Sequence, residues 1–322
     1  MVHSEHAHPF PKCLVTEFIL QGFPGSLELQ TSLFSVILIM YILTITGNII
    51  IVLIIIHDHH LHTPMYFFLG NFSFLEICYV TTLSPKMLGN FLMERRSICL
   101  YCCLTQAFFH FFLGATEFFL LATMSFDRYL AICNPFHYGT IMNHRLFCMQ
   151  LACGSWIGGL MTVFVQTILV FRLPFCGPNV INHFYCDVGP LLKLACTDTR
   201  PIEWIVFVIA TVVVLSNSLL TVVSYIFIIS TILKIPSASG RRKAFSTCTA
   251  HLTVVILLYG AITFIYVRPS GHASLGMNKV VSLLNTLVTP LLNPFIYTLR
   301  NKEVQDALRK AVAKHKIFEG KK

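Results

Sequence analysis

The stretch from Cys99 to Tyr138 reads CLYCCLTQAFFHFFLGATEFFLLATMSFDRYLAICNPFHY. Over 97–125 almost every residue is apolar, and the two clear exceptions are His110 and Glu117. A helix rises about 1.5 Å per residue, so the distance from the first residue of this stretch to Arg128 would be roughly 44 Å, about the thickness of a bilayer with its headgroups. The stretch therefore predicts one membrane-crossing helix with a cysteine at one water interface and an arginine at the other.

The composition excludes an ordinary soluble domain. Of the 322 residues, 55% are hydrophobic and only 11% are charged, whereas a soluble domain usually has about a quarter charged residues. The net charge of +9 would suggest nucleic-acid binding in a soluble protein. Here the basic residues lie in loops and in the tail, which favours the positive-inside bias of membrane proteins. We therefore expect no nucleic-acid partner.

Seven segments are long and apolar enough to cross a bilayer as helices, because about 20 apolar residues span its hydrocarbon core. We expect these spans near residues 33–56, 64–91, 97–133, 146–171, 204–233, 244–267 and 280–299. The expected fold class is an all-α membrane protein, a seven-transmembrane helix bundle over 33–299. Residues 1–32 then form an N-terminal segment, and 300–322 form a tail.

Lysine and arginine set the expected orientation. Eight of them lie on the side of the N-terminus and 14 on the other side, while Lys86 lies inside a span. Cytoplasmic loops carry the excess, so we expect an extracellular N-terminus and a cytoplasmic C-terminus. In the tail sequence NKEVQDALRKAV, Val304, Leu308, Ala311 and Val312 share one helical face. This pattern predicts a short amphipathic eighth helix that contacts membrane lipids on the cytoplasmic side.

Four cysteines lie in polar context on the expected outer side. Cys176, Cys186 and Cys196 are spaced ten residues apart in the long loop over 172–201, and Cys99 begins the third span. Outside-facing cysteines are expected to be oxidised, and four of them permit three pairings. A bridge from Cys99 would hold this loop across the outer mouth of the bundle.

Two motifs carry a family resemblance. Asp127-Arg128-Tyr129 lies at the inner end of the third span, and Asn293-Pro294-Phe295-Ile296-Tyr297 lies in the seventh. Together with seven spans and an outer cysteine on the third, they make the chain resemble a rhodopsin-like, class A G-protein-coupled receptor.

A narrower resemblance is to the olfactory, or odorant, receptors, and it covers about residues 10 to 312. The motifs that carry it are Leu61–Leu69 (LHTPMYFFL), Met124–Cys133 (MSFDRYLAIC), Ser224-Tyr225, Lys243–Leu252 (KAFSTCTAHL) and Pro290–Tyr297 (PLLNPFIY). The sixth span has no proline, which is similar to the odorant receptors and unlike most other receptors of the superfamily. The resemblance implies a multi-pass protein of the plasma membrane that is not an enzyme.

For the disulfides, we expect Cys99 to pair with Cys186 and Cys176 to pair with Cys196 within the loop. A bridge between Cys99 and Cys196 is the competing choice.

The resemblance also assigns residues to G-protein coupling and activation. The expected set is Asp127, Arg128, Tyr129, Tyr225, His251, Asn293, Pro294 and Tyr297. Arg128 would be paired with Asp127 at rest and released on activation to reach Tyr225, Tyr297 and the G-protein.

Ionisable groups inside a membrane are costly, so each one is a candidate functional residue. By resemblance, Asn48, Glu76, Glu117 and Asn293 would line a central polar cluster able to hold a sodium ion. The alternative is a hydrogen-bonded cluster in which one carboxyl group is protonated, because two close carboxylates do not both ionise cheaply. No firm metal site and no other cofactor is expected.

His110 lies two helical turns outward from Glu117 on the same face, with small residues between them. This arrangement fits a pocket for a small, mostly apolar ligand with one polar anchor. The alternative is a core histidine satisfied by a neighbouring helix. The expected ligand-binding residues are His110, Phe111, Gly114, Ala115, Phe207, Ile209, Ile262, Tyr266 and Thr286.

The function expected from these features is that of an odorant receptor. A small volatile ligand would bind in the outer half of the bundle and shift the population to a state that activates a stimulatory olfactory G-protein, raising cyclic AMP. The alternative is a non-olfactory rhodopsin-like receptor for a lipid or another small molecule. A transporter or channel would require internal repeats or a polar pore, and the sequence has neither.

Overall fold

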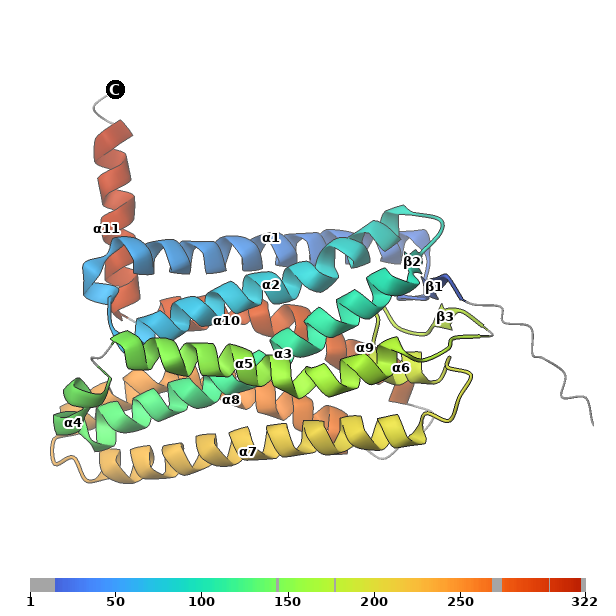
Figure 1. Cartoon of the computed structure of the whole chain (residues 1–322). Coiled ribbons are helices and arrows are strands. Elements are labelled where there is room, and N and C mark those ends of the chain that lie inside the picture. The colour runs from blue at the N-terminus through green and yellow to red at the C-terminus, as the bar shows by residue number, and fades with distance from the viewer. Residues whose placement is uncertain (1–14, 143–144, 177, 268–273, 301, 320–322) are drawn as a thin grey trace, which may run out of the picture.

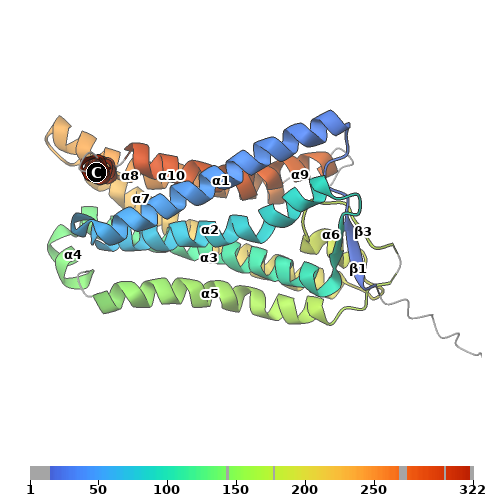
Figure 2. The same cartoon turned by 90° about the horizontal axis from the view of Figure 1, so that it is seen from above.

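The computed structural model describes residues 15–142, 145–176, 178–267, 274–300 and 302–319. Its long helices run side by side in one bundle, with connecting segments gathered at the two ends (Figures 1 and 2). The long helices are α1 (Leu27–His57), α2 (Pro64–Leu92), α3 (Leu100–Cys133), α5 (Arg145–Phe171), α7 (Arg200–Leu233) and α8 (Ala238–Val267). The seventh span consists of α9 (Ser274–Leu283), η2 (Leu284–Val288) and α10 (Thr289–Arg300).

Short elements connect the spans. They are β1 (Glu17–Leu20), η1 (His59–Leu61), β2 (Ser97–Cys99), α4 (Pro135–Ile141), β3 (Val180–Ile181) and α6 (Val188–Leu192), and α11 (Lys302–Glu319) follows the bundle. Within the described residues, six helices are long and apolar enough to cross a membrane, and α8, bent by 45°, makes seven when counted as one span. The predicted seven-helix class is confirmed.

Several helices begin before the predicted apolar spans. α1 begins at Leu27 rather than at residue 33, α7 at Arg200 rather than 204, and α8 at Ala238 rather than 244. A helix continues wherever its backbone is hydrogen-bonded and capped, and it does not stop where the hydrocarbon does. At the start of α1, for example, the Ser26 hydroxyl accepts from the Leu29 N–H at 3.3 Å. The helices therefore extend beyond the apolar runs, and the limits of the membrane-crossing spans stay predictions.

α3 begins later than predicted, at Leu100 rather than residue 97, because Ser97–Cys99 forms strand β2. β1 is the middle strand of a three-stranded sheet, antiparallel to β2 and parallel to β3. Phe18, Leu20 and Ile98 from this sheet are buried together above the outer end of the bundle. The described part of the N-terminal segment, from residue 15 on, thus covers the outer end of the bundle.

α3 is the central helix of the bundle. In the apolar part of α3, 56% of the residues are buried, the same share as in α2, against 11% in α7. α3 packs against α2, α5 and α7, whereas most of the surface of α7 faces away from the bundle. Side chains on α3 are therefore the ones placed to reach a buried site.

The tail helix α11 is longer than the short helix predicted. It runs at a steep angle to the bundle axis and is seen along its length in Figure 1 and end-on in Figure 2. The Tyr66 hydroxyl of α2 donates to the Glu303 carboxylate at 2.6 Å, and Val304 and Ala307 are buried against the bundle. The apolar face therefore holds the helix across the inner end, as a helix lying along a membrane surface requires.

Close packing of α3 against α5 depends on Gly159. A Cβ atom added at Gly159 would lie 2.9 Å from the Thr116 backbone nitrogen and 3.0 Å from its Cα. Because backbone atoms cannot move aside, Gly159→Ala is expected to lower the free energy of unfolding by about 1–3 kcal/mol. Gly154→Ala, on the same helix but with nothing within 4 Å of its added Cβ, is the matched control. Thermal unfolding of both variants in detergent measures the difference, and equal unfolding temperatures would contradict this account.

Candidate functional site

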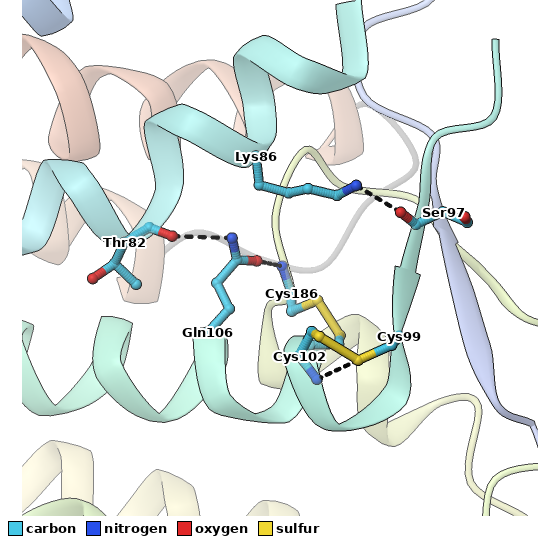
Figure 3. The surroundings of a disulfide bond; sticks show 8 residues. Thr82, Lys86, Ser97, Cys99, Cys102, Gln106 and Cys186 are labelled. Carbon is cyan, nitrogen blue, oxygen red and sulfur yellow. Dashed lines mark hydrogen bonds between the residues drawn. A yellow bond between two sulfur atoms is a disulfide. The ribbon is translucent and has the colours of Figure 1, made fainter. Parts of the chain in front are cut away.

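The outer end of α3 is tied to the long loop over 172–201 through Cys103. Cys103 is bonded to Cys186, and Cys99 is bonded to Cys102 (Figure 3). The predicted pairing of Cys99 with Cys186, and the competing pairing with Cys196, are therefore corrected. Cys99 is the exposed residue preceding the first turn of α3, whereas Cys103 lies one turn further on the buried face. Cys176 and Cys196 are bonded to each other within the loop.

Gln106 holds the same loop by hydrogen bonds. The Cys186 backbone N–H donates to Gln106 Oε1 at 3.1 Å, and Gln106 Nε2 donates to the Thr82 carbonyl of α2 at 3.1 Å (Figure 3). Gln106 was not predicted as a site residue. The signal was present in the sequence, since Gln106 is a polar residue three positions after Cys103 in an otherwise apolar run.

His110 lies beneath this loop and is 7% exposed. Its ring centroid lies 5.2 Å from that of Tyr79, 5.1 Å from Phe111 and 4.6 Å from Tyr185. Its Nδ1 atom is buried and has no hydrogen-bond partner within the described residues. A buried polar atom without a partner costs free energy, so this atom is available to a bound polar group. Tyr79 and Tyr185 were not predicted as site residues.

The other predicted ligand residues differ in how deeply they are buried. Phe111, Gly114 and Ala115 lie on α3 beside His110, and Thr286 of η2 is 2% exposed. Ile209 and Ile262 are half-buried on α7 and α8.

Phe207 is 51% exposed on the outer surface of α7, so its expected contact with a ligand inside the bundle is corrected. An apolar side chain on a helix that is apolar all round gives no sign of which way it faces. The side chain of Tyr266 lies outside the described residues.

Two residues of the loop over 172–201 have shifted pKa values. Burial, with a smaller effect of Lys279, lowers the pKa of His183 to about 4. Burial raises the pKa of Asp187 to about 6, although the N–H groups of Val188 and Gly189 oppose this shift. At neutral pH the loop therefore presents a neutral histidine and a charged aspartate. Because Cys186 is in a disulfide, it cannot join these two residues as a thiolate metal ligand.

Three of the four residues of the predicted polar cluster meet deeper in the bundle. Asn48 Nδ2 donates to Glu76 Oε2 at 3.2 Å, and Asn293 Nδ2 donates to Glu76 Oε1. α1, α2 and α10 thereby meet at one carboxyl group. Glu117 is 6% exposed on α3 and makes no hydrogen bond to another described residue, and Asn293 Oδ1 is also buried without a partner within the described part.

At the inner end of α3, Arg128 is held by its neighbour. Arg128 Nη2 lies 3.2 Å from Asp127 Oδ2, and the Tyr138 hydroxyl of α4 donates to Asp127 Oδ1 at 3.0 Å. Burial and the neighbouring Asp127 raise the pKa of Tyr138, so its hydroxyl stays protonated and able to donate. This places Arg128, 8% exposed, in a closed ion pair. Tyr129 packs against Phe227 of α7 with ring centroids 5.9 Å apart.

The remaining predicted activation residues lie on the facing helices. The Tyr225 hydroxyl and His251 Nδ1 are 2.6 Å apart, which joins α7 to α8. Tyr297 on α10 is 2% exposed, and its hydroxyl has no hydrogen-bond partner within the described residues. Pro294 lies inside α10, where Gly47 of α1 approaches it closely. Contacts of Arg128 with Tyr225 and Tyr297 on activation stay a prediction.

Comparison with known proteins shows what this arrangement resembles. Residues 37–315 match the family model described as "Olfactory receptor". The chain is 60% identical over 300 residues to human Olfactory receptor 6X1. The matched region covers 93% of the chain and 96% of the relative. It is 56% identical over 299 residues to human Olfactory receptor 6F1, a match that covers 93% of the chain and 97% of the relative. It is 52% identical over 306 residues to mouse Olfactory receptor 6E1, a match that covers 94% of the chain and 97% of the relative.

Proposed function

The chain belongs to the olfactory receptor family of class A G-protein-coupled receptors, and from this premise we propose which ligand it binds and which response it starts. It is a multi-pass plasma-membrane odorant receptor and not an enzyme. The ligand is a small, mostly apolar volatile molecule with one polar group, bound beside His110. The bound receptor activates a stimulatory olfactory G-protein and raises cyclic AMP.

One observation carries this proposal: α3 has three buried polar side chains at three different depths in the membrane. His110 lies in the outer half, Glu117 in the middle and Arg128 at the inner end, and each is buried. A ligand that contacts the outer group and a G-protein that contacts the inner one would act on the same rigid helix. Ligand binding shifts the conformational population by the difference in its affinity for the two states.

The chemistry around His110 supports the ligand class. Tyr79, Phe111 and Tyr185 form aromatic walls around its ring, which favour an apolar body. The buried Nδ1 without a partner favours one hydrogen-bonding group, such as the oxygen of an alcohol or carbonyl. Gly114 adds no side chain between this site and Glu117.

The charges at the two ends support the orientation. The end of the bundle with α4 and α11 lies opposite the end with β1, β2 and β3 (Figure 1). Arg128 is near the last turn of α3, before α4, and Cys103 is near its first turn, after β2. Cytoplasmic loops carry the excess of lysine and arginine, so the N-terminus is extracellular and the C-terminus cytoplasmic. Arg241 and Arg242 at the start of α8 add positive charge to the surface that would meet the G-protein.

A screen in transfected cells tests the proposal. Receptor-expressing cells with surface protein measured on an N-terminal tag are exposed to a panel of volatiles, and cyclic AMP is recorded. A rise that depends on one or more volatiles is expected, and it should disappear in cells that lack the stimulatory olfactory G-protein. Silence across the panel at proven surface expression, or a response that survives without that G-protein, would contradict the proposal.

His110→Phe tests the polar anchor. The variant keeps an aromatic ring between Tyr79 and Tyr185 but removes Nδ1, so an agonist with an oxygen should need about tenfold higher concentration for a half-maximal response. Phe207→Ala on the outer surface of α7 is the matched control and should leave the concentration unchanged. Concentration–response curves of cyclic AMP measure both, and an unchanged His110→Phe curve would assign His110 to packing alone.

We also infer a sodium ion at the polar cluster. Asn293 Oδ1 is a buried oxygen atom with no partner within the described residues, and Glu117 on α3 adds a carboxyl group that is 6% exposed. Hard cations prefer such oxygen ligands. These two groups and Glu76 would hold the ion. The hydrogen-bonded cluster and the Arg128–Asp127 ion pair occur in the same conformation. Bound sodium should therefore stabilise this closed conformation.

The sodium inference predicts an ion-dependent response. Replacing choline by sodium at constant ionic strength should raise the half-maximal agonist concentration of the unaltered receptor by about fivefold. Glu117→Gln should abolish that shift, while Glu28→Gln, exposed at the start of α1, should retain it. If sodium leaves the half-maximal agonist concentration unchanged in both the unaltered receptor and Glu117→Gln, the result favours the hydrogen-bonded cluster with one protonated carboxyl group.

A further inference from the structure

Two disulfides at the outer end of α3 differ sharply in their surroundings. Cys99 and Cys102 are bonded across three positions and both side chains are exposed. Cys103 and Cys186 are bonded across 83 positions and both are 0% exposed. Cys102 and Cys103 are consecutive residues of the first turn of α3, and Figure 3 shows Cys99, Cys102 and Cys186 around this turn. Water-soluble reagents can therefore reach one bridge and are excluded from the other.

The fold does not depend on the exposed bridge. A disulfide stabilises a protein mainly by closing a loop in the unfolded chain, and the effect grows with loop length. Cys99 and Cys102 are already held together by the helix start, where the Cys102 N–H donates to Cys99 Sγ at 2.9 Å. Leu100 N–H also donates to the Thr16 carbonyl at 2.9 Å. Opening this bridge would leave the local backbone in place.

The position of Cys99 makes its sulfur a good leaving group. Cys99 is the N-cap residue of α3, where the helix dipole and the free N–H groups stabilise a thiolate. Glu17, which faces Cys99 in the β1–β2 register, opposes this effect. The Cys-x-x-Cys spacing at a helix start is the arrangement in which protein thiols exchange most readily.

We propose that Cys99–Cys102 is a thiol–disulfide exchange site, opened by small water-soluble thiols while the Cys103–Cys186 bridge stays closed. The thiolate of the small thiol attacks Cys102 Sγ, the Cys99–Cys102 bond breaks, and Cys99 leaves with the electron pair as a thiolate. A second thiolate attacks the small thiol's sulfur in the mixed disulfide and frees Cys102. Two small thiols are oxidised to one disulfide, and the bridge takes up two electrons and two protons.

The opened site is a pair of thiols on one helical turn at a water-exposed surface. Two thiols at this spacing bind thiophilic reagents that require both, such as a trivalent arsenical. A single thiol would not retain such a reagent under competing monothiol.

Differential alkylation of the full-length receptor in detergent tests the proposal. The protein is incubated with graded glutathione, free thiols are blocked with a light alkylating reagent, and the remaining cysteines are reduced and blocked with a heavy one. Peptide mass spectrometry then reads each cysteine separately, including Cys13, which lies outside the described residues. Cys99 and Cys102 should become light-labelled at a glutathione concentration about tenfold below that needed for Cys103 and Cys186.

A second measurement uses retention on an immobilised phenylarsonous probe after mild reduction. Because Cys176 and Cys196 also form an exposed bridge, every protein in this test carries Cys176→Ser/Cys196→Ser. In that background the receptor should be retained, the added double variant Cys99→Ser/Cys102→Ser should not be, and added Cys153→Ser, which removes an exposed free cysteine on α5, should leave retention unchanged. Opening of all bridges at one glutathione concentration would overturn the proposal, and so would free Cys99 and Cys102 before any thiol is added. Equal retention of the double variant would overturn it as well.

Discussion

Arg128→Ala is expected to reduce the agonist-evoked rise in cyclic AMP by at least about tenfold at matched surface expression, since the variant removes the group proposed to reach the G-protein. In the closed structure Arg128 is bound by Asp127 at 3.2 Å, and the Tyr138 hydroxyl holds the second carboxylate oxygen. Removing one partner of a buried ion pair costs about 3–5 kcal/mol, because the remaining charge is left unpaired. The measurement is a concentration–response curve of cyclic AMP, normalised to surface receptor.

Two companion variants separate loss of signalling from loss of folding. Arg145→Ala removes an exposed arginine at the start of α5, on the same side of the bundle, and should respond as the unaltered receptor. Asp127→Asn frees Arg128 without removing it, so the basal cyclic AMP should rise. A full response of Arg128→Ala at normal surface level would contradict the assigned role of this residue.

Cys103→Ser is expected to remove most of the receptor from the cell surface. Loss of a disulfide that closes a long loop typically costs about 2–5 kcal/mol, which is a large part of the total stability of a folded domain. The bridge from Cys103 to Cys186 spans 83 positions and fixes the loop over 172–201 above His110. Surface staining, and unfolding temperature in detergent for the protein that can be purified, measure the loss.

The matched control is Cys99→Ser/Cys102→Ser, which removes the neighbouring short bridge as a pair and leaves no unpaired thiol beside Cys103. This double variant should keep near-normal surface expression, since its bridge spans only three positions. The sequence alone favoured Cys99 as the partner of Cys186, so the two variants compare both pairings directly. If only the double variant lost surface expression, the result would support pairing of Cys99, rather than Cys103, with Cys186.

The number of spans follows from the sequence by itself. Lipid offers no hydrogen bonds to a backbone, so each apolar run of about 20 residues is constrained to be a helix. The order of features along α3 follows too, because a helix converts residue number into depth at about 1.5 Å per residue. The depths of His110, Glu117 and Arg128 could therefore be predicted from their spacing alone.

Contacts between segments were decided only by the tertiary structure. Cys103 rather than Cys99 meets Cys186 because β2 pairs with β1 and delays the start of α3. Such pairing depends on a strand more than 70 residues away along the chain, over 17–20.

The rotation of each helix about its own axis was decided in the same way. Phe207 faces outward because of how α7 packs on α3, and an apolar residue in an apolar helix carries no mark of its direction in the sequence. Packing among α1, α2 and α10 brings Asn48, Glu76 and Asn293 to one point. Local sequence determines which segments become helices and how deep each residue lies, whereas side-chain packing between distant segments determines which residues meet.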